Sequence, residues 1–362
     1  MRQTYLVTFH PSGPYFFGND RIFRFRGDHT AGRQGGDIQT NPYYIVSENL
    51  PLQSTVFGAM RYLMLPEKGY DRIHQYADVI GPESYLPGKE ELQHFGIIRS
   101  ISPIFLYREC DSEWFIPTPF DHAGGAVYHP FSNYRVVNTP EGEQYYTGEY
   151  IPKEYESGSW MSLKDGSIAT GLFSTSVRVG INRGIDKEGF FKRSYVRLDK
   201  RFSFAVLAEL EKDIPDGTRD LVMLGQGKVP FTVRFTQYDG ERLETRAASL
   251  LRRMREAVCV QKDGAETKLT GFRYCLSDAV VFDDSTDGLY RGIPFAVTQT
   301  RSFRPLRTQG SSLKKDPGCR YLLLKAGSVL IPGEKYTKQE QTIALMNAST
   351  IGMNRIVSET TT

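Results

Sequence analysis

The chain has 362 residues, of which 40% are hydrophobic, and it carries 45 Lys and Arg against 42 Asp and Glu, so it can form one large or two ordinary domains. No apolar run reaches the roughly 18 to 20 residues of a membrane span, and the first residues lack the apolar core of a signal peptide, so we expect a cytoplasmic protein. The four cysteines, Cys110, Cys259, Cys275 and Cys319, form no C-x-x-C pair, which predicts reduced core thiols and excludes a disulfide framework or a zinc site of that spacing.

The first third of the chain predicts a strand, a long loop and a helix. Residues 4–9 alternate as a strand with one buried face. Residues 18–37 form a loop rich in glycine and arginine, including Arg21. "LPLQSTVFGAMRYLML" predicts a helix capped by Ser54 or Thr55, with Val56, Met60, Leu63 and Met64 on one face and with Gly58 and Ala59 close to a sheet.

The rest of the chain predicts mainly strands. Residues 67–172 are irregular with short strand candidates, and "VRVGI", "SYVRL" and "FSFAVLAEL" are strands around a hairpin tip at 182–193. Residues 242–258 form a helix whose apolar stripe is Leu243, Ala247, Leu250, Leu251, Met254 and Val258. Its arginines, Arg246, Arg252, Arg253 and Arg255, are expected on a solvated face. "DAVVF" and "RYLLLKAGSVLI" supply the last strands, and residues 348–362 are expected to be a polar tail.

This order of elements predicts an α+β fold, with two ferredoxin-like units as the simplest arrangement. We place the first domain at 1–207, with an acidic insertion at about 67–172, and the second at 208–350, followed by a tail at 351–362. No internal sequence repeat supports the two units.

Common catalytic and metal-binding patterns are absent from the sequence. All six histidines precede residue 130, none at metal spacing, and there is no G-x-S-x-G elbow. Asp283, Asp284 and Asp287 are better explained by a turn than by a cation site. "LLLKAGSVLIPG" at 322–333 is not a P-loop because its lysine precedes its glycines, and the Gly-x-Gly-Lys of "LGQGKVPF" at 224–231 is weak evidence alone.

Charge and aromatic residues point instead to RNA. Residues 67–172 hold 8 Lys and Arg against 16 Asp and Glu, whereas residues 173–207 hold 8 against 3 and residues 290–338 hold 10 against 2. Single-stranded RNA is held by cations on phosphates and by aromatic rings under bases. The hairpin tip and the loop at 298–316 carry both, in the sets Arg183, Lys187, Phe190, Phe191, Lys192 and Arg193, and Arg301, Phe303, Arg304, Arg307, Lys314 and Lys315. The alternative is that these charges are solvated and only keep the protein in solution.

Three stretches in order resemble the RAMP proteins of CRISPR effector complexes. They are "HPSGPYFFGNDRIFRF" with "LPLQSTVFGAMRYLML", then "TSVRVGINRGIDKEGFFKRSYVRLDKRFSFAVLAEL", and last the Ala-Gly-Ser-Val element at 326–329. Together they cover about a third of the chain and are most similar to the third subunit of type III-B (Cmr) complexes, which caps the 5′ handle of the guide RNA (crRNA). The acidic middle matches only through "WFIPTPFDH", and "LGQGKVPF" stands where a Gly-Gly-Glu-Gly-Arg-like turn is expected, so the equivalent subunits of type III-A and III-D complexes fit as well.

The resemblance implies two RRM-like domains with long inserted loops, a β-hairpin thumb, and a groove for the crRNA 5′ handle. A helix N-terminus, glycines that admit the backbone, and arginines would bind this RNA. With the basic loops, the positions expected to contact RNA are Arg21, Gln53, Ser54, Thr55, Arg61, Arg178, Gly180, Asn182, Arg183, Lys192, Arg193, Arg301, Arg304, Lys325, Gly327 and Ser328. The competing interpretation is that Arg178 and Arg197 only face solvent and that Gly180 and Gly327 form bulges.

The resemblance also implies partners and the lack of an activity. We expect a non-catalytic subunit, without cofactor or metal, beside a polymerase-like large subunit, the backbone RAMP subunits and the target RNA. The acidic segment would face a protein. Two alternatives stay open: a metal-independent endoribonuclease that processes CRISPR transcripts, and a scaffold that binds no RNA.

Overall fold

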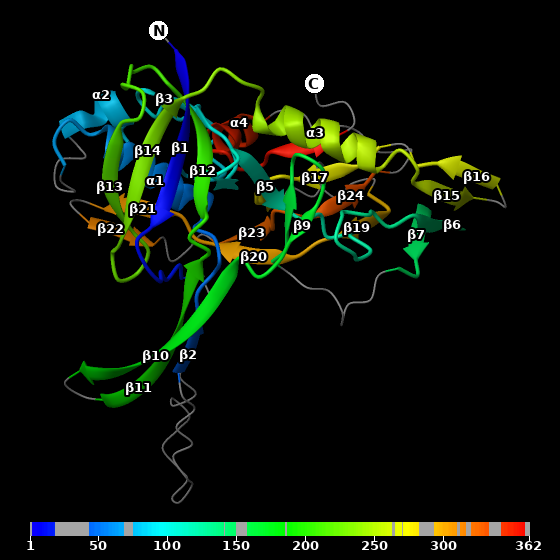
Figure 1. The fold of residues 1–362 in the computed structure, drawn as a ribbon, viewed down its shortest axis with the longest axis horizontal. Helices are drawn as coiled ribbons and strands as arrows, with labels where there is room; N and C mark the ends of the chain where they lie inside the picture. Colours follow the sequence, from blue (N-terminus) through cyan, green and yellow to red (C-terminus); the bar gives the residue numbers. More distant parts are fainter. Residues whose placement is uncertain are drawn as a thin grey trace, which may run out of the picture.

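The computed structural model describes residues 2–18, 43–68, 75–140, 142–149, 158–184, 187–262, 265–269, 271–281, 293–309, 312–315, 320–332 and 342–358. Mostly antiparallel sheets and few helices make up this part of the chain (Figure 1). The predicted α+β class is therefore confirmed. No helix among the described residues is long and apolar enough to cross a membrane.

The first unit is built on a nine-stranded sheet. Its strands are β1 (Gln3–Pro11), β3 (Ile98–Ile101), β4 (Phe105–Arg108), β5 (Glu113–Pro117), β8 (Trp160–Ser162), β9 (Ile168–Ala169), β12 (Phe202–Leu210), β13 (Arg219–Leu224) and β14 (Val229–Gln237). Within it, the order β14-β1-β12-β4 is antiparallel throughout, and helix α1 (Gln53–Met64) follows β1. This is the ferredoxin-like plan: the fourth strand lies beside the first, and the third lies between the first and the second. Between the third and the fourth strand of the plan, where a second helix is expected, the chain forms strand β13 instead.

The second unit repeats this order of strands, but among its described residues it keeps the second helix of the plan and not the first. Its strands β17 (Arg273–Cys275), β19 (Phe295–Val297), β24 (Val329–Ile331) and β25 (Ile356–Ser358) lie in the order β25-β17-β24-β19, and every pair is antiparallel. Helix α4 (Ile343–Thr350) connects the third strand to the fourth. Each unit thus keeps one of the two helices expected of the plan among the residues described.

Smaller sheets complete the fold. One joins β6 (Asn133–Thr139), β7 (Gly142–Thr147), β15 (Cys259–Lys262) and β16 (Ala265–Lys268); another joins β18 (Ala279–Val281), β20 (Thr300–Phe303) and β23 (Tyr321–Leu324); and β21 (Leu306–Gln309) pairs with β22 (Ser312–Lys315). Helix α2 (Ala77–Ile80) is one turn long. A last sheet contains β10 (Phe173–Gly184), β11 (Lys187–Leu198) and β2 (Tyr43–Val46).

The two faces of the large sheet are buried by different helices. Val56, Met60, Leu63 and Met64 of α1 are buried with Tyr5 and the other inward residues of β1, as the predicted stripe requires. Leu243, Ala247, Leu250 and Leu251 of α3 (Leu243–Met254) are buried with Leu6 and Leu207 on the opposite face. The two predicted helices are confirmed, but α3 ends at Met254, which is half-buried, and Val258 of the predicted stripe lies beyond the helix. Gly58 does not approach a sheet, because it is exposed with open space around it.

Three expectations about the organisation of the chain are wrong. The boundary at 207 divides the first sheet, because β14 pairs with β1 along its length. The acidic middle is not irregular: its short strand candidates form β3, β4 and β5, as predicted, and it also supplies β8, β9 and buried Phe105, Trp114 and Ile116. The end of the chain is not a polar tail: α4 and β25 are formed, and Ile351, Met353 and Val357 are buried.

Two polar details also differ from the prediction. Arg255, expected on a solvated face, is buried and pairs with buried Asp121, while its Nη2 also lies 2.7 Å from Tyr128 Oη. Helix α3 ends one residue before it, so the side chain turns inward instead of following the solvent face. Cys110 is an exposed thiol, unlike buried Cys275.

Candidate nucleic-acid interface

Strands β10 and β11 form a long antiparallel hairpin, called the arm below, over residues 173–198. The register pairs Phe173 with Leu198 at its root and Gly184 with Lys187 at its tip. The arm extends away from the body of the protein, and β2 runs parallel to β11 along part of it (Figure 1). The predicted hairpin is therefore present: the strands expected at 177–181 and 194–198 are formed, and both continue into the segment 182–193 that was predicted as the tip.

One face of the arm collects cationic side chains. Residues directly opposite in an antiparallel pair share a face, and so do residues two apart on one strand. The register pairs Arg178 with Arg193, Ser176 with Tyr195, and Ser174 with Arg197. These six residues therefore form one surface, called the basic face.

Aromatic rings hold the guanidinium groups of the basic face. The Cζ atom of Arg178 lies 4.8 Å from the centroid of the Tyr195 ring. Tyr195 meets buried Phe16 edge-on, with 5.8 Å between centroids, and Arg193 lies over Phe16 at 5.9 Å. Phe16 belongs to the body of the protein, so these contacts fix the root of the basic face to the core. Cations alternating with aromatic rings suit single-stranded nucleic acid.

Three exposed cations of the arm are not neutralised within the described part of the protein. Residues 173–198 contain six Lys and Arg against two Asp and Glu. Exposed Arg178, Lys192 and Arg197 have no acidic partner among the described residues. Basic side chains of the body do find such partners: Arg99 pairs with Glu211, Arg108 with Asp111 and Arg201 with Asp199. The arm is thus a projecting cationic surface able to attract a polyanion.

The opposite face of the arm is different in chemistry. It carries Val177 and Val179, which are 54% and 63% exposed, together with Lys192, which is paired with Val179. Lys192 and Arg193, which were both expected to contact RNA, therefore point to opposite faces. Gly180, Asn182 and Arg183 lie on the arm strand β10. The side chains of Asn182 and Arg183, the burial of Gly180, and residue Arg21 fall outside what the structure describes.

The start of α1 does not present the groups expected of an RNA site. Gln53 is buried; its Nε2 donates to the Ser102 carbonyl at 2.9 Å, and its Oε1 accepts from the Ile104 amide at 3.1 Å. The helix is capped at Leu52 without any side-chain hydrogen bond, so neither half-buried Ser54 nor Thr55 is the cap. Arg61 is also buried. It donates to the carbonyls of Ile80 and Gly81 at 2.7 and 2.9 Å, and burial lowers its pKa to about 10.

The Lys325–Ser328 turn is also interior. It connects β23 to β24, and both are inner strands of their sheets, so the exposed sheet edge expected from an unbroken strand does not exist there. Gly327 is buried with φ +99°, and a Cβ at this position would come within 2.5 Å of the Phe120 ring. Ser328 is buried, and its hydroxyl donates to the Lys325 carbonyl at 2.7 Å. Lys325 and Ala326 are half-buried, so of the three positions predicted here only Lys325 reaches the surface.

The basic loop at 298–316 is partly used for structure. Arg301 pairs with Asp278, whose other carboxylate oxygen accepts from the Ala326 amide at 3.0 Å. Arg301 therefore helps to hold the Lys325–Ser328 turn. Arg304 is half-buried, and the side chains of Arg307, Lys314 and Lys315 lie outside the described residues. Of the predicted positions, the structure gathers Arg178 and Arg193 on one surface.

Sequence reasoning missed the residues that organise this surface. Tyr195 and Phe16 were not predicted, and Arg197 was considered only as a solvent-facing residue. Alternation could have found Tyr195 and Arg197, because they follow Arg193 at steps of two along one strand. Nothing in the local sequence places Phe16 beside them, because that contact joins segments far apart in the chain.

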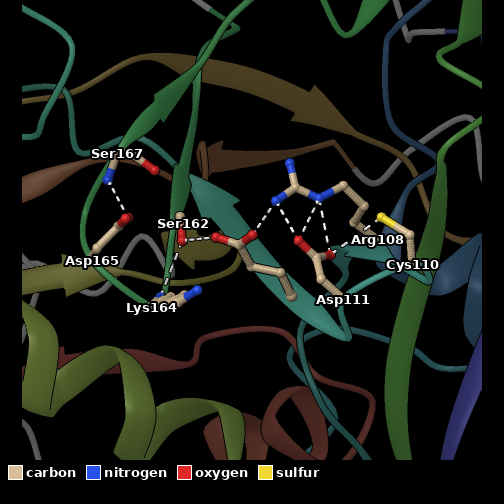
Figure 2. A network of polar contacts seen from close by, with 8 residues as sticks. Arg108, Cys110, Asp111, Ser162, Lys164, Asp165 and Ser167 are labelled. Atoms are coloured by element: carbon tan, nitrogen blue, oxygen red, sulfur yellow. Dashed lines mark hydrogen bonds and ion pairs between the residues drawn. The ribbon is translucent and has the colours of Figure 1, made fainter.

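A second polar cluster lies on the first sheet, around Arg108 (Figure 2). Arg108 donates to Asp111 at 2.7 to 3.1 Å and also pairs with Glu113, which accepts from the Ser162 hydroxyl. The Arg108 guanidinium holds the pKa of Asp111 well below its usual range, and the Ser167 amide lowers the pKa of Asp165. Carboxylates kept ionised are poor proton donors near neutral pH, so the cluster has the properties of a structural ion network. No group of His, Cys, Asp and Glu suited to a metal ion occurs among the residues described.

Comparisons with known proteins give matches only among solved structures. No protein-family model and no curated protein matches the chain. One similar structure is a Type III-B Cmr-beta bound to cognate target RNA and AMPPnP (TM-score 0.46, 12% identity, 97% of this chain and 95% of that chain). Another is the Type III-B Cmr-beta bound to cognate target RNA (0.47, 11%, 97% and 96%), and a third is the Csm1-Csm4 cassette in complex with pppApA (0.29, 11%, 99% and 94%). Because these likenesses are so distant, the function proposed below rests on the residues of this chain.

Proposed function

We propose that the protein is a non-catalytic, cytoplasmic subunit of a type III CRISPR ribonucleoprotein, and that its arm binds the 5′ handle of the crRNA. The observation that carries this proposal is the basic face, where exposed Arg178 and Arg197 have no acidic partner among the described residues and where the rings of Tyr195 and Phe16 lie beside guanidinium groups. The ordered motifs in the sequence supply the class of complex. A polymerase-like large subunit and the backbone RAMP subunits are the proposed protein partners, with target RNA nearby.

Binding of the RNA backbone by the basic face would be electrostatic and would not depend on the RNA sequence. Each phosphate neutralised by a lysine or arginine releases a bound counterion, so affinity falls as salt rises. Arginine suits this task because its planar guanidinium can pair with phosphate and also stack on a ring. The handle sequence would be read elsewhere along the groove, by base contacts.

Co-purified nucleic acid tests the proposal. The full chain, expressed in cells that transcribe a CRISPR array, should carry guide-sized RNA with a common 5′ end. Arg178→Ala combined with Arg193→Ala should lose most of it, whereas Lys212→Ala combined with Arg253→Ala, which removes the same charge from exposed sites off the arm, should not. Equal RNA content in both double variants contradicts the assignment of the arm, and a complete lack of bound RNA contradicts RNA binding.

The alternative function is a metal-independent endoribonuclease, which Tyr and Lys side chains could support without histidine. It is tested by incubating the purified chain with CRISPR repeat RNA in EDTA. We expect the RNA to remain intact. A defined cut that depends on this chain would replace the non-catalytic proposal.

A further inference from the structure

The turn at residues 225–228, Gly-Gln-Gly-Lys, lies at the root of the arm. It joins β13 to β14, and Figure 1 shows this end of the two strands on the same side of the sheet as the arm. As a sequence motif, a lone Gly-x-Gly-Lys is weak evidence for a phosphate site. In the fold, however, the turn lies against the segment that contains Phe16.

One short segment separates the turn from the basic face. The amide of Tyr15 donates to the Val196 carbonyl at 2.8 Å, and the Val196 amide donates back at 2.9 Å. On the other side of the same segment, the Gln226 amide donates to the Phe16 carbonyl at 2.9 Å. Adjacent extended chains lie about 4.8 Å apart, so the backbone of the turn is roughly 10 Å from that of β11. Phe16, the ring beneath Arg193 and Tyr195, belongs to this separating segment.

Gly225 allows the turn to pack closely against that segment. Gly225 has φ +74°, and a Cβ there would lie 2.5 Å from the Phe16 carbonyl oxygen, so only glycine fits without movement. Gly227 has φ +100° and open space on its Cβ side. Gly227 therefore leaves open space in which another backbone could approach the turn.

The turn presents hydrogen-bond donors that the described residues leave unused. Lys228 is exposed and has no acidic partner among them, and it adopts φ +51°, which is uncommon for a residue other than glycine. The amide of Lys228 is used within the turn, donating to the Gly225 carbonyl at 3.3 Å, and that of Gln226 is used by Phe16. The Gly227 amide has no such partner in the described structure. One free amide beside an ammonium group, in a left-handed turn, is a favourable arrangement for an anion.

We propose that the 225–228 turn binds a backbone phosphate of the same RNA strand that contacts the basic face. This inference rests on the proposed function, because it requires RNA on the arm. The donors would be Lys228 Nζ and the Gly227 amide, and Gly227 would admit the RNA backbone. The RNA path would then run from the arm across Phe16 to the end of the large sheet, and not toward the tip alone.

The test measures binding of a 3′-fluorescein-labelled oligouridine to the full chain over a series of salt concentrations. Lys228→Asn removes the charge and keeps a residue that tolerates positive φ, and Lys228→Arg keeps the charge. Lys212→Asn is the matched control: Lys212 is exposed without an acidic partner among the described residues, and it follows the far end of β12, about 30 Å from the root of the arm.

We expect Lys228→Asn to weaken binding about two- to fivefold and to reduce the slope of log affinity against log salt by about 0.7, the value for one phosphate contact on a single strand. Lys228→Arg and Lys212→Asn should match the unaltered chain. If Lys228→Asn binds like the unaltered chain with the same slope while Arg178→Ala is impaired, the turn is not part of the site and the proposed function stands. If the folded, unaltered chain does not bind the oligouridine, both proposals fail.

Discussion

The guanidinium of Arg178 lies over the ring of Tyr195, although the strand register places Arg178 directly opposite Arg193. Like charges directly opposite in a sheet repel each other. The two arginines reduce this repulsion by folding onto different rings, Arg178 onto Tyr195 and Arg193 onto Phe16. A pair of opposed arginines costs stability in the free protein, and a bound polyanion would remove that cost.

Tyr195 should act by positioning Arg178. Tyr195→Leu removes the ring and leaves every charge in place, so we expect RNA affinity to fall about two- to fivefold, as for loss of an exposed cation–π contact of about 0.5 to 1 kcal/mol. Tyr195→Phe keeps the ring and should bind normally. Fluorescence anisotropy with labelled RNA distinguishes the two, and equal loss in both variants would instead indicate a role for the hydroxyl.

Gln53 should matter for stability and not for RNA binding. Gln53→Leu leaves the Ser102 carbonyl and the Ile104 amide without their buried partner, which should lower the free energy of unfolding by about 2 kcal/mol. Ser54→Ala, at the half-buried neighbouring position, should change it little. Urea denaturation measures both. A stable Gln53→Leu variant with impaired RNA binding would restore the original expectation for this residue.

The pair of Asp121 and Arg255 should be strongly coupled because both side chains are buried. Asp121→Ala leaves an uncompensated buried guanidinium and should destabilise the protein by about 3 to 5 kcal/mol. Asp121→Leu with Arg255→Met removes both charges and should cost much less. For comparison, removing Asp199 from its exposed pair with Arg201 should cost about 0 to 1 kcal/mol. Additive losses in the buried double variant would show that the two groups do not depend on each other.

Gly327 should tolerate no side chain. In Gly327→Ala the strain of φ +99° adds to a clash with the Phe120 ring, so we expect a loss of about 3 kcal/mol. Gly171 also has positive φ, +68°, but has open space around it, and Gly171→Ala should cost only about 1 kcal/mol. Thermal unfolding of the two variants checks this difference. Equal losses would mean that the ring moves aside at little cost.

Local patterns in the sequence predicted much of the secondary structure. The alternation at 4–9 and the stripes on α1 and α3 report burial of apolar side chains, which depends on spacing within one element. Polar residues were placed less well. Gln53, Arg61 and Arg255 are types usually found at the surface, and only the backbone groups and charges brought to them by distant segments account for their burial.

The candidate site could likewise be predicted only where it depends on local sequence patterns. Arg178 and Arg193 could be placed on a hairpin from strand patterns, and the fold confirms the hairpin. The connection to Phe16 and to the 225–228 turn depends on hydrogen bonds between segments that are remote in sequence. The apolar run around 325–328 predicts one continuous strand. In the structure, Gly327 with its positive φ allows the chain to pass there from one sheet to another.

The pairing of β1 has a consequence for how the protein is made. Gln3 pairs with Leu210 and Tyr5 pairs with Gln237, so both neighbours of β1 are translated long after it. Pairings so distant in sequence form slowly, and an unpaired strand edge can bind other chains meanwhile. Strand β1 therefore keeps an unpaired edge during synthesis until β14 has been translated and pairs with it.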